Sequence, residues 1–280
     1  MKNTVDLHIH TVASDGLYTP TQIVSMARRR GLRTIAITDH DTVSGVAEAL
    51  EAARGTSLEV IPGVELSTSS GDIEAHLLGY GIDYTSGALV DRLARFQSLR
   101  LQRAKEILRR LRDKGIELSW EQLLDLAGGE CVGRPHIARA LQDTHYVDSF
   151  REAFDRYLAE GKPAYVPRVK MTPSEAIDLV AEAGGVPVLA HPWDQRSLVP
   201  SLVDDGLIGL EVYYPQYTPS MTAQLKRLAA RHQLICTGGS DFHGLSIAPQ
   251  NHLGGVHVPA ACVQALKRAC AAGFTNKGMA

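Results

Sequence analysis

Residues 6–16 read DLHIHTVASDG, an apolar run that carries two histidines at alternate positions and then turns. Because alternate side chains of a β-strand point to the same face, this run predicts a strand whose end presents His8 and His10 together. Seven short apolar, β-branched segments of this kind recur, with segments of helical period between most of them. Strands that alternate with helices predict an α/β fold with a mainly parallel sheet. The expected strands are 4–10, 33–40, 58–65, 73–82, 186–191, 207–214 and 234–240.

The helices are marked by their apolar period and, in two cases, by their first residues. Pro20 and Pro173 each follow a threonine that can cap a helix, so both predict a helix start. Residues 87–161 break the alternation, because their apolar period is helical throughout. We therefore expect a helical insertion at 87–161 over the active site, within a barrel or sheet formed by residues 1–86 and 162–280.

Composition limits the class of protein. The 280 residues include 29 Lys and Arg against 31 Asp and Glu, so a basic field over the whole protein, as a general nucleic-acid or membrane binder has, is excluded. The four cysteines form no CxxC pair, so neither a zinc ribbon nor a disulfide framework is indicated. Charged and imidazole groups stand where a signal peptide needs an apolar run, and no stretch spans a bilayer. We expect a cytoplasmic protein.

Histidines and carboxylates recur where the expected strands end. The carboxyl ends of parallel strands meet at one face of the fold, so we expect these side chains to share a pocket. Nine mixed imidazole and carboxylate groups suit two or three divalent ions rather than one, and without a thiolate the plausible ions are Mn²⁺, Zn²⁺ and Fe²⁺. A hydrogen-bonded structural histidine is the alternative, strongest for His76 in mid-segment. The candidate ligands are His8, His10, Asp15, His40, Glu65, His76, His191, Asp241 and His243.

The runs DLHIHTVASDG, ITDHDT, GVELS, HLLGY, VLAHP and GGSDFH, in this order over essentially the whole chain, resemble the PHP (polymerase and histidinol phosphatase) family of metal-dependent phosphoesterases. The resemblance implies a distorted (β/α)7 barrel with two or three metal ions at the strand ends, Mn²⁺ being the first expectation. No ligand position is substituted, which argues against a non-catalytic member. The implied ligand sets are His8, His10, Glu65 and Asp241; Glu65, His76 and His191, with Glu65 as the bridge; and Asp15, His40 and His243.

Phosphoester hydrolysis explains why such a centre is needed. A phosphoester is anionic and repels hydroxide, whereas metal ions neutralise its oxygens and acidify a bound water. We expect Asp15, His40 and His243 to be catalytic, because that set would help the leaving oxygen depart. Asp39 and Asp41 flank His40 and are candidates to orient its ring; helix capping is the alternative for Asp41.

A basic segment in the expected insertion gives a clue to the substrate. Between Asp91 and Lys114 there are nine basic residues and three acidic ones. Arg100 falls inside the apolar stripe of the expected helix and Arg103 lies at its edge, where an unpaired arginine is rarely tolerated. A helix over the pocket that directs both guanidinium groups at a substrate phosphate removes this conflict. A buried carboxylate partner for Arg100 is the alternative.

A second candidate anion site is the segment VGRPH at residues 132–136. Gly133 permits close approach of the backbone, and Pro135 at a helix start leaves N–H groups free for an anion. Stand-alone bacterial PHP proteins that resemble this chain carry a similar GRPHIA segment. We therefore expect Arg134 and His136 to bind phosphate.

Three further residues complete the substrate-binding prediction. Lys170 is a weaker candidate for phosphate binding. Trp193 and Tyr214 both follow expected strands and either stack on a base or pack in the fold.

The resemblance leaves several functions open. One group of similar stand-alone proteins removes the 3′-phosphate from nucleoside 3′,5′-bisphosphates, and a related group trims RNA from a 5′-monophosphate end. The near-neutral charge favours a small nucleotide such as adenosine 3′,5′-bisphosphate over long RNA. We therefore expect a bisphosphate phosphatase whose products are the 5′-nucleotide and phosphate. The alternatives are a 5′-to-3′ exoribonuclease on short RNA, a histidinol-phosphate phosphatase, a metal-binding regulatory module and an amidohydrolase. No protein partner or membrane is implied.

Overall fold

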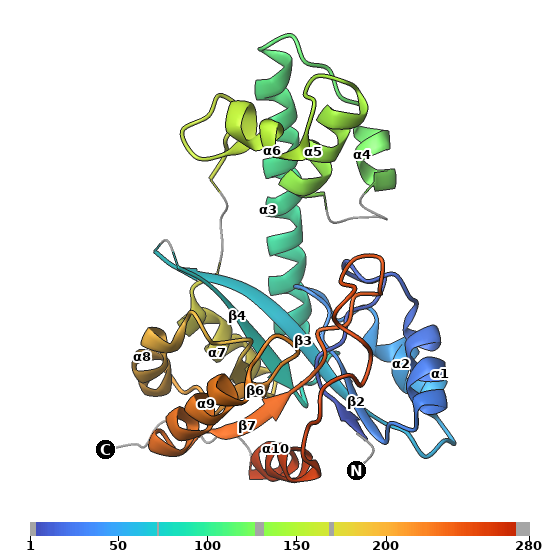
Figure 1. The fold of residues 1–280 in the computed structure, drawn as a ribbon, viewed down its shortest axis with the longest axis vertical. Helices are drawn as coiled ribbons and strands as arrows, with labels where there is room; N and C mark the ends of the chain where they lie inside the picture. The colour runs from blue at the N-terminus through green and yellow to red at the C-terminus, as the bar shows by residue number, and fades with distance from the viewer. Residues whose placement is uncertain (1–3, 72, 127–131, 168–170, 273–280) are drawn as a thin grey trace. The chain divides into compact units, whose positions relative to one another are not determined.

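The computed structural model describes residues 4–71, 73–126, 132–167 and 171–272 (Figure 1). The chain divides into two compact units. The sheet unit comprises Met1–Asp91 and Lys170–Ala280, and the helical unit comprises Arg92–Val169. The nine predicted metal ligands all belong to the sheet unit.

The sheet unit is built on seven strands whose order in space follows the order in the chain. The predicted α/β fold with a mainly parallel sheet is confirmed, and each predicted strand is present in shorter or longer form. The exception to parallel pairing is β4, which is antiparallel to both β3 and β5 because β3 turns directly back into it. Gly71 lies in this turn at φ 58°, which favours glycine. The strands are β1 (Val5–Asp6), β2 (Thr34–Ile37), β3 (Glu59–Ser70), β4 (Ile73–Tyr80), β5 (Val186–Leu189), β6 (Gly209–Tyr213) and β7 (Ile235–Gly238).

The sheet is curled so that its two edges meet just beyond β1 and β7. Leu7 N donates to Gly238 O at 3.2 Å, and Ile9 forms an isolated parallel bridge with Phe242. The buried Asp6 carboxylate joins the same two ends of the chain: it accepts hydrogen bonds from the backbone N–H and hydroxyl of Ser240. The segments after β1 and β7 are therefore held side by side, and these segments carry five of the predicted ligands.

Helices surround the sheet (Figure 1). The two predicted helix starts are confirmed: Pro20 and Pro173 are the first residues of α1 and α7, and each preceding threonine caps its helix in a reciprocal capping box. The sheet unit contains six α-helices and one 3₁₀ turn among the described residues. They are α1 (Pro20–Arg30), α2 (Val46–Ala53), α7 (Pro173–Glu182), the 3₁₀ turn η2 (Arg196–Leu198), α8 (Val199–Asp204), α9 (Pro219–Arg231) and α10 (Ala260–Ala272).

Every described element between residues 87 and 161 is a helix. The helical unit has a hydrophobic core of its own, formed around Ile107, Leu111, Ile137 and Leu141. Within the described residues, no helix combines the length and hydropathy that crossing a bilayer requires. The helices are α3 (Gly87–Arg112), α4 (Trp120–Leu126), α5 (Arg134–Asp143), α6 (Phe150–Ala153) and the π-helical turn η1 (Phe154–Leu158).

Candidate metal centre

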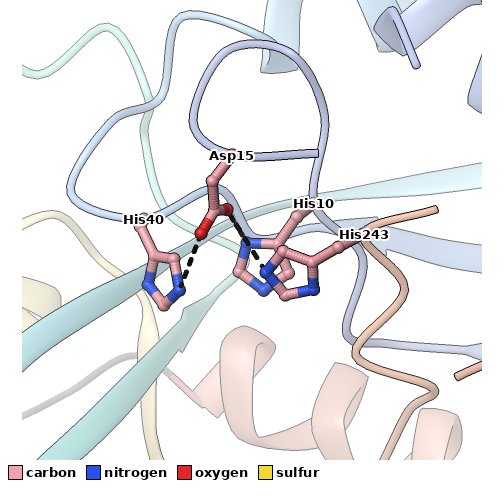
Figure 2. A group of neighbouring side chains, drawn as sticks. All are labelled: His10, Asp15, His40 and His243. Carbon is pink, nitrogen blue, oxygen red and sulfur yellow. Dashed lines mark ion pairs between the residues drawn. The ribbon is translucent and has the colours of Figure 1, made fainter. Parts of the chain in front are cut away.

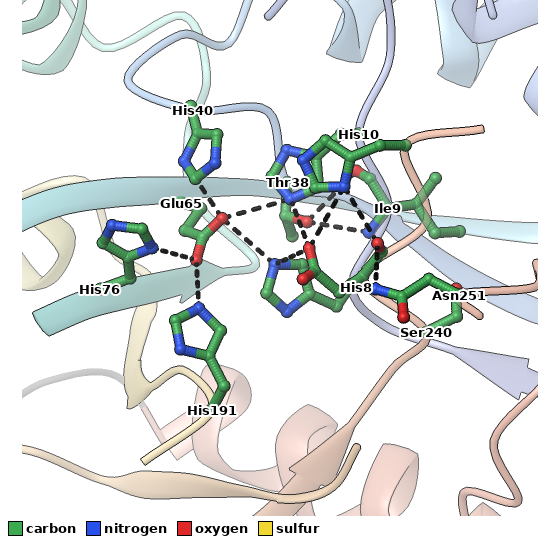
Figure 3. A network of polar contacts seen from close by, with 12 residues as sticks. His8, Ile9, His10, Thr38, His40, Glu65, His76, His191, Ser240 and Asn251 are labelled. Atoms are coloured by element: carbon green, nitrogen blue, oxygen red, sulfur yellow. Dashed lines mark hydrogen bonds and ion pairs between the residues drawn. The ribbon is translucent and has the colours of Figure 1, made fainter. Parts of the chain in front are cut away.

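The predicted ligands meet at the carboxyl-terminal ends of the strands (Figures 2 and 3). Loops after β1, β2, β5 and β7 carry most of them, while β3 and β4 carry the other two within their length. The contributing residues are His8, His10 and Asp15 after β1, His40 after β2, Glu65 in β3, His76 in β4, His191 after β5, and Asp241 and His243 after β7.

Glu65 lies at the middle of this cluster, with 1% of its side chain exposed. Its Oε2 lies 3.2 Å from Nε2 of both His8 and His10. The same oxygen lies 3.2 Å from Nδ1 of His40. Burial alone raises the pKa of this carboxyl, but the imidazoles that face it, His40 foremost, hold the pKa well below its usual value. Glu65 is therefore an anion at the centre of a ring of histidines.

The second oxygen of Glu65 faces a different pair of histidines (Figure 3). Oε1 lies 3.0 Å from Nδ1 of His76 and 3.2 Å from Nε2 of His191. The two oxygens of one carboxylate thus face two groups of histidines, so Glu65 is the residue that would be shared by two divalent ions bound here.

Asp241 completes the buried side of the cluster. Its Oδ1 lies 3.2 Å from His10 Nε2 and 3.4 Å from His8 Nε2. Burial lowers the pKa of His10, but the carboxylates of Asp241 and Glu65 more than reverse this and raise it to about 10. The same two carboxylates would favour a divalent cation bound beside His10.

The third predicted set gathers around Asp15 (Figure 2). Asp15 Oδ1 lies 3.2 Å from His243 Nε2, and Asp15 Oδ2 lies 3.9 Å from His40 Nε2. His10 also approaches this set, with its Nδ1 3.7 Å from Asp15 Oδ1. Because 52% of the Asp15 side chain is exposed, this carboxylate marks the rim of the cluster.

The donor atoms fit divalent cations. Both ring nitrogens of His10 and Nδ1 of His40 are buried with no hydrogen-bond partner among the described residues, which is costly unless another ligand satisfies them. Around an ion with bonds of about 2.1 Å, neighbouring ligand atoms lie roughly 3.0–3.4 Å apart. The separations of 3.0–3.4 Å around Glu65 and Asp241 match this spacing. These are the separations that the nitrogens and oxygens would have around shared ions.

Three overlapping groups of ligand atoms lie within 4.8 Å of one another. They share His10, His40 and Glu65, so ions bound to them would be close neighbours. His191 approaches the cluster through Glu65 Oε1. The groups are His8, His10, Glu65 and Asp241; His40, Glu65 and His76; and His10, Asp15, His40 and His243.

Glu211 is a functional residue that the sequence reasoning missed. It is fully buried in β6, where its Oε1 accepts a hydrogen bond from His8 Nδ1 at 2.9 Å. Its Oε2 accepts one from the backbone N–H of His191 at 2.8 Å. The first contact fixes the tautomer of His8, so that its Nε2 faces Glu65. A glutamate inside the otherwise apolar run GLEVY was the signal available in the sequence.

We expect Glu211→Gln to weaken binding of divalent ions by about 10- to 100-fold, because the neutral amide has one acceptor oxygen and cannot accept hydrogen bonds from both His8 and His191. Titration of the metal-free protein with Mn²⁺ or Zn²⁺ measures the change. The exposed Glu182→Gln on α7 is the control and leaves the affinity as it is. Unchanged affinity in Glu211→Gln would remove the supporting role assigned to Glu211.

Tyr214 also supports a candidate metal ligand, Asp241. Its hydroxyl donates to Asp241 Oδ2 at 2.8 Å, and its ring centroid lies 5.6 Å from that of His191. Asp241 and His191 both adopt positive φ, 52° and 29°, which is unusual for residues other than glycine. Asn251 Nδ2 donates to the carbonyl of Asp241 and helps to hold this backbone.

The aspartates beside His40 both hydrogen-bond to neighbouring segments. Asp39 accepts hydrogen bonds from the backbone N–H and hydroxyl of Thr11 and from the hydroxyl of Ser14. It therefore positions the loop that carries Asp15. The capping alternative for Asp41 is wrong, because Gly45 is the N-cap residue of α2. Asp41 Oδ1 instead accepts from the backbone N–H of Ser67.

The predicted phosphate-binding arginines lie in the helical unit. Arg103 Nε donates to Val166 O at 2.8 Å, and Arg100 is half-buried on the same helix. Arg134 Nη1 donates to Leu158 O at 3.4 Å. The guanidinium carbon of Arg134 also lies 5.9 Å from the ring centroid of Tyr165, beside Val166. Arg103 and Arg134 thus approach neighbouring parts of one segment.

The other predicted substrate contacts differ in their surroundings. His136 Nδ1 accepts from the backbone N–H of Gly133 at 3.1 Å, so this ring caps α5 and occupies one of the N–H groups expected for an anion. One face of Trp193 is covered by Arg196, whose guanidinium carbon lies 3.5 Å from the ring centroid. Lys170 lies outside the described residues.

Comparison with known proteins agrees with this geometry. Residues 6–165 match the PHP domain family. The chain is 40% identical over 248 residues to the 5′-3′ exoribonuclease Rnm of Salmonella typhimurium, an alignment that covers 85% of this chain and 84% of that protein. It is 35% identical over 247 residues to the 3′,5′-nucleoside bisphosphate phosphatase of Chromobacterium violaceum, covering 85% and 87%.

A solved structure extends the similarity to the fold. A protein of Bifidobacterium adolescentis, described as a metal-dependent phosphoesterase, superposes with a TM-score of 0.79 at 33% identity. The superposition covers 95% of this chain and 96% of that one. The predicted family resemblance and enzyme class are therefore confirmed. The chain belongs to the PHP domain family, and it is a metal-dependent phosphoesterase of that family.

Proposed function

We propose that this enzyme hydrolyses the P–O3′ bond of nucleotides that carry a 5′-phosphate, and that its main substrates are nucleoside 3′,5′-bisphosphates. The oxygen of water joins phosphorus, and the 3′-oxygen leaves with a proton. The products are the 5′-nucleotide and phosphate. The similarity to a bisphosphate phosphatase over 85% of the chain supports this substrate class.

The observation that carries the proposal is the pair of oxygens of Glu65, which serve two groups of histidines at 3.0–3.2 Å. Bound divalent ions, with Mn²⁺ as our first choice, would supply neutralisation of the phosphate oxygens and acidification of a water. The protein holds these positions with buried imidazoles and excludes bulk solvent from the inner side. We assign Asp15, His40 and His243 to the side of the leaving 3′-oxygen, because this set has the most exposed carboxylate.

The 5′-phosphate needs an anion site away from the ions, and Arg134 is our principal candidate. A guanidinium group has five N–H donors, and among the described residues Arg134 uses only Nη1 in a hydrogen bond. Its Nε and Nη2 remain for a phosphate. Arg100, Arg103 and His136 of the same unit, and Lys170, are proposed to assist.

An exoribonuclease acting on 5′-phosphorylated RNA is the second candidate. The 40% identity to Rnm favours it. In a chain that starts with a 5′-phosphate, release of the first nucleotide breaks the same P–O3′ bond, and the phosphate stays on the next nucleotide. One centre with one 5′-phosphate site therefore serves both reactions, which differ only in what else is attached to phosphorus.

The direct test is to incubate the Mn²⁺-loaded protein with adenosine 3′,5′-bisphosphate, with a short 5′-phosphorylated RNA and with histidinol phosphate. We expect rapid release of phosphate from the bisphosphate with AMP left behind. Stepwise release of mononucleotides, with poor bisphosphate turnover, would make the exoribonuclease the main function. Preferential turnover of histidinol phosphate would overturn the proposal.

Arg134→Ala is expected to raise KM for adenosine 3′,5′-bisphosphate by about 10-fold or more, the effect of losing a charged hydrogen bond to phosphate. Hydrolysis of an aryl phosphate, which has no second phosphate, should change little. Arg139→Ala is the matched control, because Arg139 lies exposed on the same helix and pairs with Asp143. Equal losses on both substrates would exclude a 5′-phosphate site at Arg134.

A further inference from the structure

A row of aromatic rings leads away from the metal centre within the sheet unit. The ring centroids of His191 and Tyr214 lie 5.6 Å apart, and those of Tyr214 and Tyr217 lie 5.2 Å apart. The hydroxyl of Tyr214 touches Asp241, so the row begins at a candidate ligand. The proposed hydrolysis of small bisphosphates has no need of an aromatic row that extends beyond the site of phosphorus.

The row opens into a groove of 390 Å³. One wall is the face of α9 that carries Thr222 and Lys226, and the segment before α10 contributes His257. Lys226 and His257 are exposed, and Lys226 Nζ lies 4.9 Å from the ring centroid of Tyr213. The tyrosine groove, as we name it, is lined by Tyr213, Tyr214, Tyr217, Thr222, Lys226 and His257, among others.

We propose that the tyrosine groove binds the nucleotide on the 3′ side of the scissile phosphate in a 5′-phosphorylated RNA. This inference rests on the second candidate function, hydrolysis of 5′-phosphorylated RNA, and deepens it. Aromatic rings beside a cation are the combination that binds single-stranded nucleic acid without regard to sequence, through stacking of bases and contact with phosphates. The volume lies in the usual range of pockets for small ligands, about 300–1,000 Å³.

The tyrosine groove adjoins the metal centre, and this position favours RNA as its occupant. The scissile phosphorus must lie at the ions. The next nucleotide of a bound RNA must therefore lie on a surface that adjoins them. Tyr214 belongs both to the groove and to the support of Asp241. A nucleoside 3′,5′-bisphosphate has nothing attached beyond its 3′-phosphate and leaves the groove empty. The groove therefore distinguishes the two substrates.

The test compares RNA with bisphosphate in variants of α9. Lys226→Gln is expected to lower kcat/KM for a 5′-phosphorylated trinucleotide by about fivefold, through loss of a phosphate contact. Ala223→Glu places a negative charge in the groove and should lower it by about tenfold or more. Neither change reaches the bisphosphate, so the ratio of RNA to bisphosphate turnover should fall. Equal changes on both substrates, or none on RNA, would overturn the proposal.

Matched controls lie on the same helix. Arg227→Gln and Ala230→Glu alter exposed residues that do not line the groove, and they should leave the ratio unchanged. A fall of similar size in these controls would show a general effect of charge on α9 and would also overturn the proposal.

A binding measurement separates this inference from the proposed function. Fluorescence anisotropy of a 3′-labelled, 5′-phosphorylated RNA with a non-hydrolysable first linkage reports binding to the full-length, metal-loaded protein without catalysis. Weaker binding to Lys226→Gln than to Arg227→Gln supports the groove even if RNA is not cleaved. Equal binding to the two variants, or no RNA binding by the unmodified protein, rejects the groove while bisphosphate turnover stands.

Discussion

Glu65→Gln is expected to lower kcat for adenosine 3′,5′-bisphosphate by about 10³-fold or more, equivalent to ~4 kcal/mol in the barrier. The substitution keeps the shape of the side chain but removes the charge that faces five histidines. An amide also offers only one oxygen, so it cannot serve two ions. The same variant should hold fewer metal ions per chain after dialysis.

Kinetics, elemental analysis and thermal unfolding of the same preparation check this expectation. Glu59→Gln is the control on the same strand, since Glu59 is exposed and pairs with Lys267 at the surface. If Glu65→Gln keeps its ions and its rate while folding normally, then Glu65 is not the bridge, and the two-sided geometry has another explanation.

Gly239→Ala should have the largest effect on stability. A Cβ at residue 239 would lie 2.3 Å from the backbone nitrogen of His8 and 2.4 Å from its Cβ, where no atom fits. Because this neighbour is backbone, the ends of β1 and β7 must separate. We expect a loss of about 3 kcal/mol or more in the free energy of unfolding, which lowers Tm by about 6–12 °C.

Gly87→Ala provides the comparison, because a Cβ at residue 87 meets nothing within 4 Å. Its Tm should stay within about 2 °C of the unmodified protein. Displacement of His8 in Gly239→Ala should also lower the number of bound ions. A stable Gly239→Ala protein that still binds its metal would show that the contact between these two segments is adaptable.

Much of the metal centre could be predicted from the sequence, because side chains alternate along a strand and parallel strands end at the same edge of the sheet. The alternation of His8 and His10 places both rings on one face, and parallel strands bring their carboxyl ends to one edge. The caps at Thr19 and Thr172 are local signals, since each threonine hydrogen-bonds three residues ahead. Such features need only short stretches of sequence.

Other features depend on contacts between distant residues. The family resemblance implied that His10 shares a site with Asp241, but nothing indicated that its ring also faces Asp15, because this depends on how two loops pack. In the sequence, Glu211 is a single acidic residue in an apolar strand, and its contacts with His8 and His191 become evident only in the structure. β4 is antiparallel because only a short turn separates it from β3. A parallel β4 would have needed a helical crossover between the two strands.

The meeting of the two edges of the sheet has a consequence for folding. His8 and its partner Glu211 are 203 positions apart in the chain, and Asp6 and Ser240 are 234 apart. Closing such a loop costs entropy before its contacts form, so these contacts are made late. A chain that lacks its last forty residues retains His8, His10 and Glu65 but lacks Asp241, and cannot assemble the centre. Metal uptake during refolding would therefore report the final joining of the two ends of the chain.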